Sequence, residues 1–365
     1  MFNFGNIRVQ TKVIIQIRWF YREEIFVINT MERRKGMYDL NELKKGSAVL
    51  SKSFDFTVLT PLFMHGWQST DDRNRSRAIN AELRGSSIRG VLRYWWRSLQ
   101  TGNNTPASLL QKEQTLFGGS SGGDESTCRS PLLLMLSSRD REAIQEHIGK
   151  DNLCPHKEYE NRVIPSFALK PERKLRIEMK VLNKDSQGWD TYVNYFLVTF
   201  MLAGFGQRSR RGSGAVQLDE FKWMDVTEFR KALQTILTDL HLGQEFNFRP
   251  NHSSCLAERT MQPNTYPRLM RIWLGQASNS AEEVRYKISE AGHIANSGSS
   301  RHPQQMLGNV GRRGTPRLAS PLLCTVRRIG RDYYPLVSEM SNLHMNEPDY
   351  TTQRNKFLQN LGVSI

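Results

Sequence analysis

Four glycines and three arginines are concentrated in the eleven residues GFGQRSRRGSG at 204–214. Glycine lets backbone N–H groups approach a ligand closely and can end a helix in the left-handed conformation. Guanidinium groups match phosphate oxygens in bidentate geometry. We therefore expect a pliable loop that binds phosphate, with a mobile turn that binds nothing as the alternative. The candidate residues are Gly204, Gly206, Arg208, Arg210, Arg211, Gly212 and Gly214.

A second cationic surface is expected on a helix between residues 82 and 100, ELRGSSIRGVLRYWWRSLQ. Its arginines recur at intervals of four, which places them on one helix face, opposite an apolar face that includes Trp95. The helix N-terminus adds the positive end of a dipole, which also favours anions. A solvated charged face with both tryptophans in the core is the alternative. The residues expected on or beside the cationic face are Arg84, Arg89, Arg93, Arg97 and Trp96.

Hydrophobic periodicity predicts the elements that would position these residues. Alternation predicts strands, and apolar residues three and four apart predict helices. In chain order we expect a strand at 53–59, a helix capped by Ser86 or Ser87, strands at 131–138 and 176–182, a helix at 190–204 capped by Asp190, and a strand at 215–223. Between 138 and about 174 we expect an irregular insert. This order, strand-helix-strand-strand-helix-strand, is that of the ferredoxin-like split βαβ fold, which RNA-recognition modules also use.

A second unit follows residue 224. Its expected elements are a helix at 227–240, a strand at 268–274, a helix near 281–291, and a hairpin from LLCTVRRI into YYPLVSEM. A segment rich in Gly, Ser and Arg, 292–317, contains GNVGRRGTPR, and its Arg312 and Arg313 are further RNA-contact candidates. We predict an α+β protein with tandem ferredoxin-like domains, at 51–223 and 224–365, the second of them degenerate. Residues 1–50 are an extension, either a hairpin or a leader upstream of Met31 or Met37.

The composition favours a polyanionic partner. Among 365 residues, 51 Lys and Arg stand against 36 Asp and Glu, a formal net charge of +15. Such an excess favours nucleic acid over a neutral metabolite, with a merely solubilising basic surface as the alternative. The four cysteines include no Cys-x-x-Cys pair, which indicates a reducing compartment. No apolar run approaches the ~20 residues that cross a bilayer, so we expect a cytoplasmic protein with no membrane partner.

No metal or other cofactor is expected. Pairs of ligand-type side chains occur, but such pairs arise by chance. The acidic pair lies in DDRNRSR, where the arginines can neutralise it. The glycine-rich loop lacks the Lys-Ser or Lys-Thr of a nucleoside-triphosphate site. The pairs are Cys154 with His156, His252 with Cys255, and Asp71 with Asp72.

Several motifs closely resemble those of the RAMP proteins of CRISPR systems, and specifically those of the first subunit of type III-B Cmr effector complexes. The motifs are TPLF at 60–63, ELR at 82–84, SIRG at 87–90, LRYWWR at 92–97, LFG at 116–118 and RLASPL at 317–322, together with the loop at 204–214. The resemblance covers residues 54 to about 340. Residues 1 to about 50 have no counterpart in it.

The resemblance implies tandem ferredoxin-like domains that bind RNA inside a multisubunit complex. By that likeness the chain contacts guide RNA and target RNA near the 3′ end of the guide, beside other RAMP subunits, especially the capping and backbone subunits. Arg84, Arg89, Arg93, Arg208, Arg210 and Arg211 become RNA-contact residues. Sequence choice would belong to base pairing, and the chain itself would hold RNA by phosphate and shape.

Catalysis is the rival reading, because similar proteins cut guide precursors without a metal, using a histidine as acid and base. His65, which follows the first strand, is the candidate, with Lys52 or Tyr94 assisting. A lone histidine in a polar loop is more often a surface or ligand-contact residue. We therefore expect no enzyme activity, with a metal-independent endoribonuclease as the alternative. A purely structural adaptor is a third class.

Overall fold

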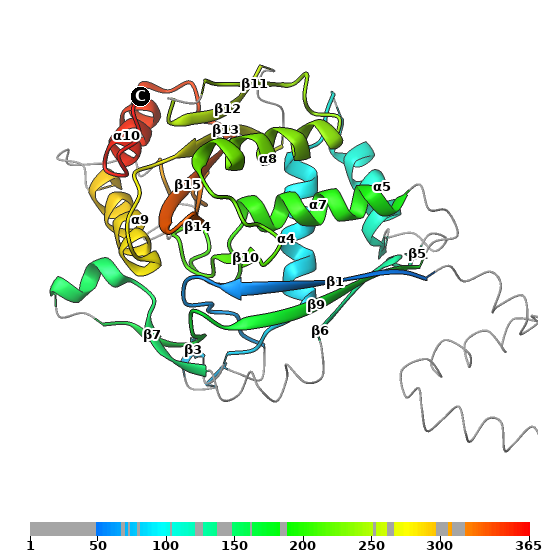
Figure 1. Cartoon of the computed structure of the whole chain (residues 1–365), viewed down its shortest axis with the longest axis horizontal. Helices are drawn as coiled ribbons and strands as arrows, with labels where there is room; N and C mark the ends of the chain where they lie inside the picture. Colours follow the sequence, from blue (N-terminus) through cyan, green and yellow to red (C-terminus); the bar gives the residue numbers. More distant parts are fainter. Residues whose placement is uncertain are drawn as a thin grey trace, which may run out of the picture. The chain divides into compact units, whose positions relative to one another are not determined.

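Figure 1 shows the computed structural model of the chain. It describes residues 49–66, 70–71, 74–78, 81–102, 104–120, 127–136, 148–160, 163–182, 188–250, 253–260, 266–296, 306–308 and 318–365. The predicted extension at 1–50, with Met31 and Met37, lies almost wholly outside the described residues. None of the helices that the structure describes is long and apolar enough to cross a membrane.

The first sheet is antiparallel and has four strands in the spatial order β10-β1-β9-β6. Its strands are β1 (Val49–Val58), β6 (Leu132–Leu136), β9 (Lys174–Leu182) and β10 (Val216–Leu218). In β1, Phe54, Phe56 and Val58 are buried on one face, while Asp55 on the other face pairs with Arg176. The strands predicted at 53–59, 131–138 and 176–182 are confirmed. The strand predicted at 215–223 ends already at Leu218.

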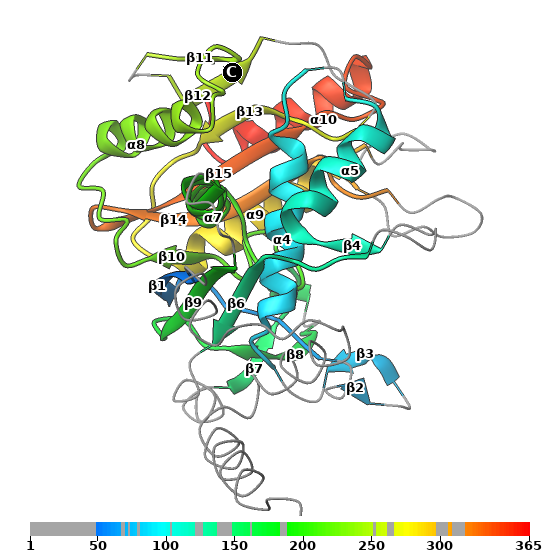
Figure 2. The ribbon, with the colours of Figure 1, turned by 90° about the vertical axis from the view of Figure 1, so that its right-hand side faces the viewer.

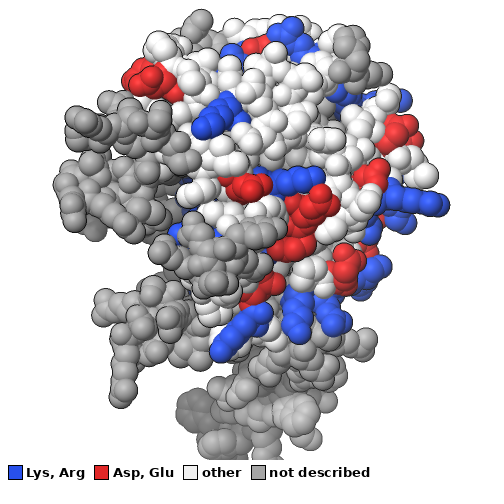
Figure 3. All heavy atoms as spheres, turned by 90° about the vertical axis from the view of Figure 1, so that its left-hand side faces the viewer, with Lys and Arg blue, Asp and Glu red and all other residues white. Residues whose placement is uncertain are grey.

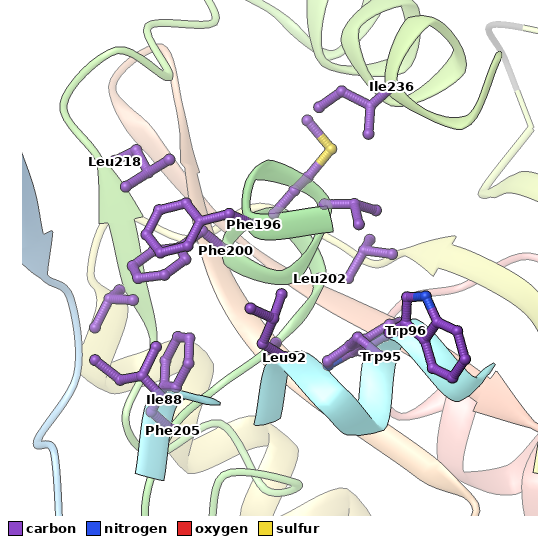
Figure 4. Close-up of a cluster of buried hydrophobic side chains, with 14 of the residues drawn as sticks. Ile88, Leu92, Trp95, Trp96, Phe196, Phe200, Leu202, Phe205, Leu218 and Ile236 are labelled. Carbon is purple, nitrogen blue, oxygen red and sulfur yellow. The ribbon is translucent and has the colours of Figure 1, made fainter. Parts of the chain in front are cut away.

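Two helices pack on the inner face of this sheet, α4 (Gly85–Ser98) and α7 (Trp189–Leu202). Figure 4 shows Ile88, Leu92 and Trp95 of α4 pointing toward α7. The expected helices are confirmed, but their expected caps are wrong. Arg84 has an extended backbone and is the N-cap of α4, so Ser86 and Ser87 lie inside the first turn of that helix. Gly188 is the N-cap of α7, so Asp190 lies inside its first turn.

The segment expected to be an irregular insert contains regular structure. A hairpin of β7 (Ile148–Asn152) and β8 (Pro165–Leu169) encloses the short 3-10 helix η2 (Pro155–Glu160). The remaining elements of this half are α5 (Pro106–Phe117), β2 (Thr70–Asp71), β3 (Asn74–Ala78), β4 (Gly119–Ser120) and β5 (Thr127–Cys128). The side chains of the hairpin alternate less clearly between apolar and polar than those of β1, which is why periodicity did not indicate it.

The second sheet has five antiparallel strands in the order β11-β12-β13-β15-β14. Its elements are α8 (Val226–Asp239), β11 (Phe246–Phe248), β12 (Cys255–Arg259), β13 (Leu269–Leu274), α9 (Ala281–Asn296), β14 (Leu322–Ile329), β15 (Asp332–Met340) and α10 (Pro348–Gln359). These confirm both expected helices, the expected strand and the expected hairpin. The two sheets together confirm the α+β prediction.

Helix α7, with α4 and α8, lies between the two sheets, and Figure 2 shows α7 end-on in this central position. One hydrophobic core spans the first sheet, these helices and the facing side of the second sheet. A separate core forms where α9 and α10 cover the opposite side of the second sheet. The chain is therefore layered as sheet, helices, sheet, helices.

Arg327 of β14 fastens the second sheet to the end of α7. It is fully buried, and among the described residues no carboxylate pairs with it. The last carbonyl groups of a helix lack partners within the helix and carry the negative end of its dipole, so a guanidinium is well placed there. Burial lowers the pKa of Arg327 to about 9, which still leaves it protonated at pH 7. Its acceptors are the carbonyl oxygens of Met201 at 2.6 Å, Ala203 at 2.7 Å, Phe200 and Val326 at 2.8 Å, and Val216 at 3.0 Å.

Candidate functional site

The loop at 204–214 is tightly held by the protein, so the expectation of a pliable loop is wrong. The backbone N–H groups of Phe205, Gln207, Gly212 and Gly214 each donate to a carbonyl oxygen of the protein. These carbonyls come from Gly214, Phe63, Cys324 and Pro61, at 2.7 to 3.1 Å. These four N–H groups are therefore not available to bind a phosphate. The glycines were expected to let backbone N–H groups approach a ligand, and for these four groups that expectation is wrong.

Glycine is needed in the loop for conformation and close packing. Gly206 and Gly214 have φ of +79° and +64°, the left-handed region that L side chains rarely adopt. A Cβ atom at Gly214 would lie 1.8 Å from the carbonyl oxygen of Phe205, and one at Gly206 would lie 2.4 Å from that of Phe63. The glycines thus fold the loop back on itself, and this fold presents the arginine side chains.

The arginines of the loop line a pocket of about 740 Å³. Its walls are loop residues 208–211, η2 with Cys154, the C-terminal half of α9, and residues 307–308 and 318–320. It is therefore built by segments from both halves of the chain. We call it the cationic pocket because, in the described part of the chain, no Asp or Glu side chain lines it. Its basic side chains are His156, Lys157, Arg208, Arg210, Arg211 and His293.

Arg208 and Lys157 supply charge that no described carboxylate neutralises. Arg208 is exposed and, unlike nearly all other described non-glycine residues, has a left-handed backbone with φ of +58°. Positive charge without a counter-ion in a concave site attracts anions. The surface on the side of α9 and α10, which faces the viewer in Figure 3, carries mixed charge, with acidic side chains among Lys and Arg.

Arg210 and Arg211 have structural partners as well. Arg210 Nη1 donates to the carbonyl oxygen of Ser320, and its guanidinium lies 5.7 Å from the centroid of the Tyr94 ring. Arg211 Nη2 donates to the carbonyl oxygen of Leu307 at 2.7 Å. Burial lowers the pKa of Arg211. Both arginines therefore hold the segments at 306–308 and 318–320, which precede β14, to the loop while lining the pocket.

Two buried polar atoms of pocket-lining residues have no hydrogen-bond partner among the described residues. Arg211 Nη1 is a donor and Asn296 Oδ1 is an acceptor. A buried polar group without a partner costs free energy, so a ligand that satisfies both atoms gains affinity. A ribonucleotide carries phosphate oxygens that accept and a 2′-hydroxyl that donates.

A pair of stacked histidines completes the wall of the cationic pocket. The ring centroids of His156 and His293 are 5.1 Å apart, and His156 Nδ1 lies 2.6 Å from Ser289 Oγ. Cys154 lies beside them, and burial keeps it away from solvent. No group of three His, Cys, Asp or Glu suited to a metal ion was found in the parts of the chain that the structure describes.

The cationic face expected on α4 is partly neutralised. The buried carboxylate of Glu113 on α5 accepts from Arg93 Nε and, at 2.7 Å, from Arg97 Nη1. Arg93 is therefore held by an ion pair within the protein, and its contact with RNA stays a prediction. Two arginines share one carboxylate, so a single net positive charge remains there.

The expectation that Trp96 lies on the RNA-contacting side of α4 is wrong. Only 2% of it is exposed, because α5 packs over that side of α4 and the Trp96 ring meets Phe117 edge-on at 5.9 Å. Its ring is therefore not available for stacking on a base. Arg84 and Arg89 are half-buried at the start of α4, and neither of them lines the cationic pocket. Glu82 lies 4.0 Å from Arg84, and Arg89 Nε is buried without a partner.

His65 is half-buried and bonded to the backbone of β8. Its Nε2 lies 2.7 Å from the carbonyl oxygen of Phe167, which makes Nε2 the donor, and its Nδ1 is buried without a partner. Burial lowers the pKa of His65, and the bond to Phe167 only partly opposes this. The expected helpers are engaged elsewhere, since Lys52 pairs with Glu220 and Tyr94 lies beside Arg210.

Residues 55–217, from β1 to β10, match the RAMP superfamily. This part of the chain is similar to RAMP domains. It contains the first sheet, α4, α7 and the arginine loop, so the resemblance deduced from the motifs is confirmed.

Similar proteins extend the likeness beyond the RAMP domain. A curated relative, the CRISPR system Cmr subunit Cmr1-2 of Pyrococcus furiosus, is 23% identical over 189 residues, which are 47% of this chain and 96% of the relative. The apo crystal structure of Cmr1 from Pyrococcus furiosus aligns with 85% of this chain and 96% of its own, with a TM-score of 0.54 and 15% identity. A chain of the type III-B Cmr-β complex bound to cognate target RNA, AMPPnP and ssDNA being present, aligns with 86% of this chain and 98% of its own, at a TM-score of 0.50 and 13% identity. The fold is shared with these proteins.

Several expected site residues lie outside the described residues, and several lining residues were not expected. Arg312, Arg313, Asp72 and His252 belong to the first group. Lys157, Ser289, His293 and Asn296 belong to the second. They lie about 50 to 90 residues from the loop in the sequence, so only the three-dimensional packing brings them to it.

Proposed function

We propose that this chain is a non-catalytic RNA-binding subunit of a type III-B CRISPR effector complex, engaging guide and target RNA near the guide 3′ end. The observation that carries the proposal is the cationic pocket, where loop arginines and Lys157 converge without a described carboxylate. Phosphate contacts of this kind give affinity without sequence preference. The relatives named above belong to Cmr complexes, one of them bound to target RNA, which supports the assignment.

We also infer that both sheets are ferredoxin-like, with domains near 51–223 and 224–365. In chain order, the first sheet is arranged fourth-first-third-second with a helix after the first and third strands, as in the split βαβ fold. In the second sheet, β13, β14 and β15 take the first, second and third places, with α9 after the first strand and α10 after the third. The fourth place is held by β12, which precedes β13, and this supports a degenerate second domain.

The test removes charge from the cationic pocket and leaves its structural bonds in place. Arg208→Gln with Lys157→Gln is better suited than changes at Arg210 or Arg211, because those two also bond to the backbone of Ser320 and Leu307. We expect the double variant of the full chain to bind single-stranded RNA about tenfold more weakly across sequences. The slope of log affinity against log salt should fall by about 0.7 per lost phosphate contact.

Arg331→Gln is the matched control. Arg331 is an exposed arginine in the turn that follows β14, and the cationic pocket lies at the other end of that strand, roughly 25 Å away at the usual rise per residue. The control should bind like the wild type. If the double variant keeps the wild-type salt slope but loses affinity for neighbouring RAMP subunits, the chain is a structural adaptor and the proposal is wrong.

Catalysis is tested at His65. We expect the purified chain incubated with guide precursor to give no specific fragment, and His65→Ala to leave cleavage by the assembled complex unchanged, because Nε2 is already bonded to Phe167. The measurement is gel separation of end-labelled RNA. A discrete fragment that disappears in the variant would establish the endoribonuclease instead.

A further inference from the structure

A second, smaller pocket adjoins the cationic pocket across Arg210. It has a volume of about 250 Å³ and is lined by α4, by the end of α7 and by the first residues of β14. Val91 and Tyr94 supply an aliphatic and an aromatic wall, and Cys324 lies at the other side. Burial raises the pKa of the Cys324 thiol to about 12, so it is uncharged at pH 7. We call this the apolar pocket.

Arg210 and Ser209 line both pockets. The two sites are therefore neighbours with opposite character, one cationic and one mostly apolar with an aromatic face. Its volume lies below the ~300–1,000 Å³ of sites that enclose whole small ligands, so the apolar pocket suits one part of a larger ligand. A nucleotide has this division, with an anionic phosphate joined to a flat aromatic base.

We propose that the apolar pocket receives one nucleobase, turned out of the RNA strand, while the adjoining phosphate lies in the cationic pocket. Unstacked bases of single-stranded RNA are commonly held against aromatic side chains in this way. Tyr94 offers the ring face, and Arg210 marks the boundary between base and phosphate. This inference rests on the proposed function. It adds a contact with one base to an RNA strand that is otherwise held by its phosphates.

Gly90 gives a selective test because it lines the apolar pocket and has no neighbouring atom within 4 Å of a Cβ placed on it. Gly90→Leu should fill the pocket from α4 and leaves the sequence of the arginine loop unchanged. Glycine is also unfavourable inside a helix, so the variant should unfold at the same or a higher temperature than the wild type. Gly90→Ala adds a single carbon and is the matched control.

The experiment compares two decamers with identical phosphates, oligouridylate and its abasic analogue, by titration of the full chain. We expect wild type and Gly90→Ala to prefer the base-bearing decamer roughly tenfold, as one stacked base contributes. Gly90→Leu should lose most of that preference and keep its affinity for the abasic decamer.

Equal binding of both decamers by the wild type, or an unchanged preference in Gly90→Leu, overturns the base pocket and leaves the phosphate site standing. In the second case the preference for a base arises elsewhere on the chain. Failure of both decamers to bind overturns this inference and the proposed function together.

Discussion

Replacing Arg327 by methionine is expected to lower the free energy of unfolding by about 3–5 kcal/mol, because several buried carbonyl oxygens lose their donor at once. Methionine has a similar length and fills much of the space, so the loss reports on hydrogen bonding more than on a cavity. Three of the stranded oxygens belong to Phe200, Met201 and Ala203 at the end of α7. Domains of this kind are stable by only ~5–15 kcal/mol, so a third of the total is at stake.

Urea unfolding followed by circular dichroism measures the effect, with the midpoint falling and the slope unchanged. Arg327→Lys should fall between methionine and wild type, since an ammonium keeps the charge but lacks the planar fork. Arg328→Met is the matched control, because Arg328 is the next residue of β14 and its side chain is exposed on the other face. If both methionine variants unfold alike, Arg327 does not fasten the sheet to the helix.

Gly214→Ala should have the second large effect, a loss of roughly 2–5 kcal/mol in unfolding free energy. The φ of +64° disfavours any L side chain, and the added Cβ would meet the carbonyl oxygen of Phe205 at 1.8 Å. That carbonyl cannot move aside without disturbing the pairing between Phe205 and Gly214. The loop that presents Arg208 would then rearrange, and RNA affinity should fall with stability.

Thermal unfolding and RNA titration below the transition measure the two effects separately. Gly90→Ala serves here as the comparison, because the same atom is added where there is open space and should leave stability equal or higher. A Gly214→Ala protein with wild-type stability would mean that the loop is as pliable as its composition suggested.

Periodicity was sufficient for the framework of the fold and insufficient for its contacts. The stripe of Ile88, Leu92 and Trp95 predicted α4 because each side chain faces the same layer. Trp96 lies at the border of that stripe, and its burial depends on α5, a helix whose weak amphipathicity gave no warning. Glu113, which pairs with Arg93, also lies on α5. One unrecognised helix therefore explains both the burial of Trp96 and the ion pair of Arg93.

The site was predictable only where its residues are close together in the sequence. The arginines of the loop identified themselves by composition, whereas Lys157 and His293 reach the cationic pocket from elements about 50 and 80 residues away. The burial of Arg327 was not predicted, because a charged side chain in a strand normally points toward solvent. Long-range packing decided these positions, and no local pattern carries that information.

The hydrogen bonds between the loop and Cys324 also determine when, during synthesis of the chain, the cationic pocket can form. The N–H of Gly212 and the carbonyl of Arg210 both meet Cys324, more than 100 residues later in the chain. At ~5–20 residues per second, a ribosome makes the arginines roughly 5–20 s before it makes their support. During synthesis the arginine segment is therefore present before the hairpin of β14 and β15 that fixes its fold, and the cationic pocket forms only after that hairpin has been made.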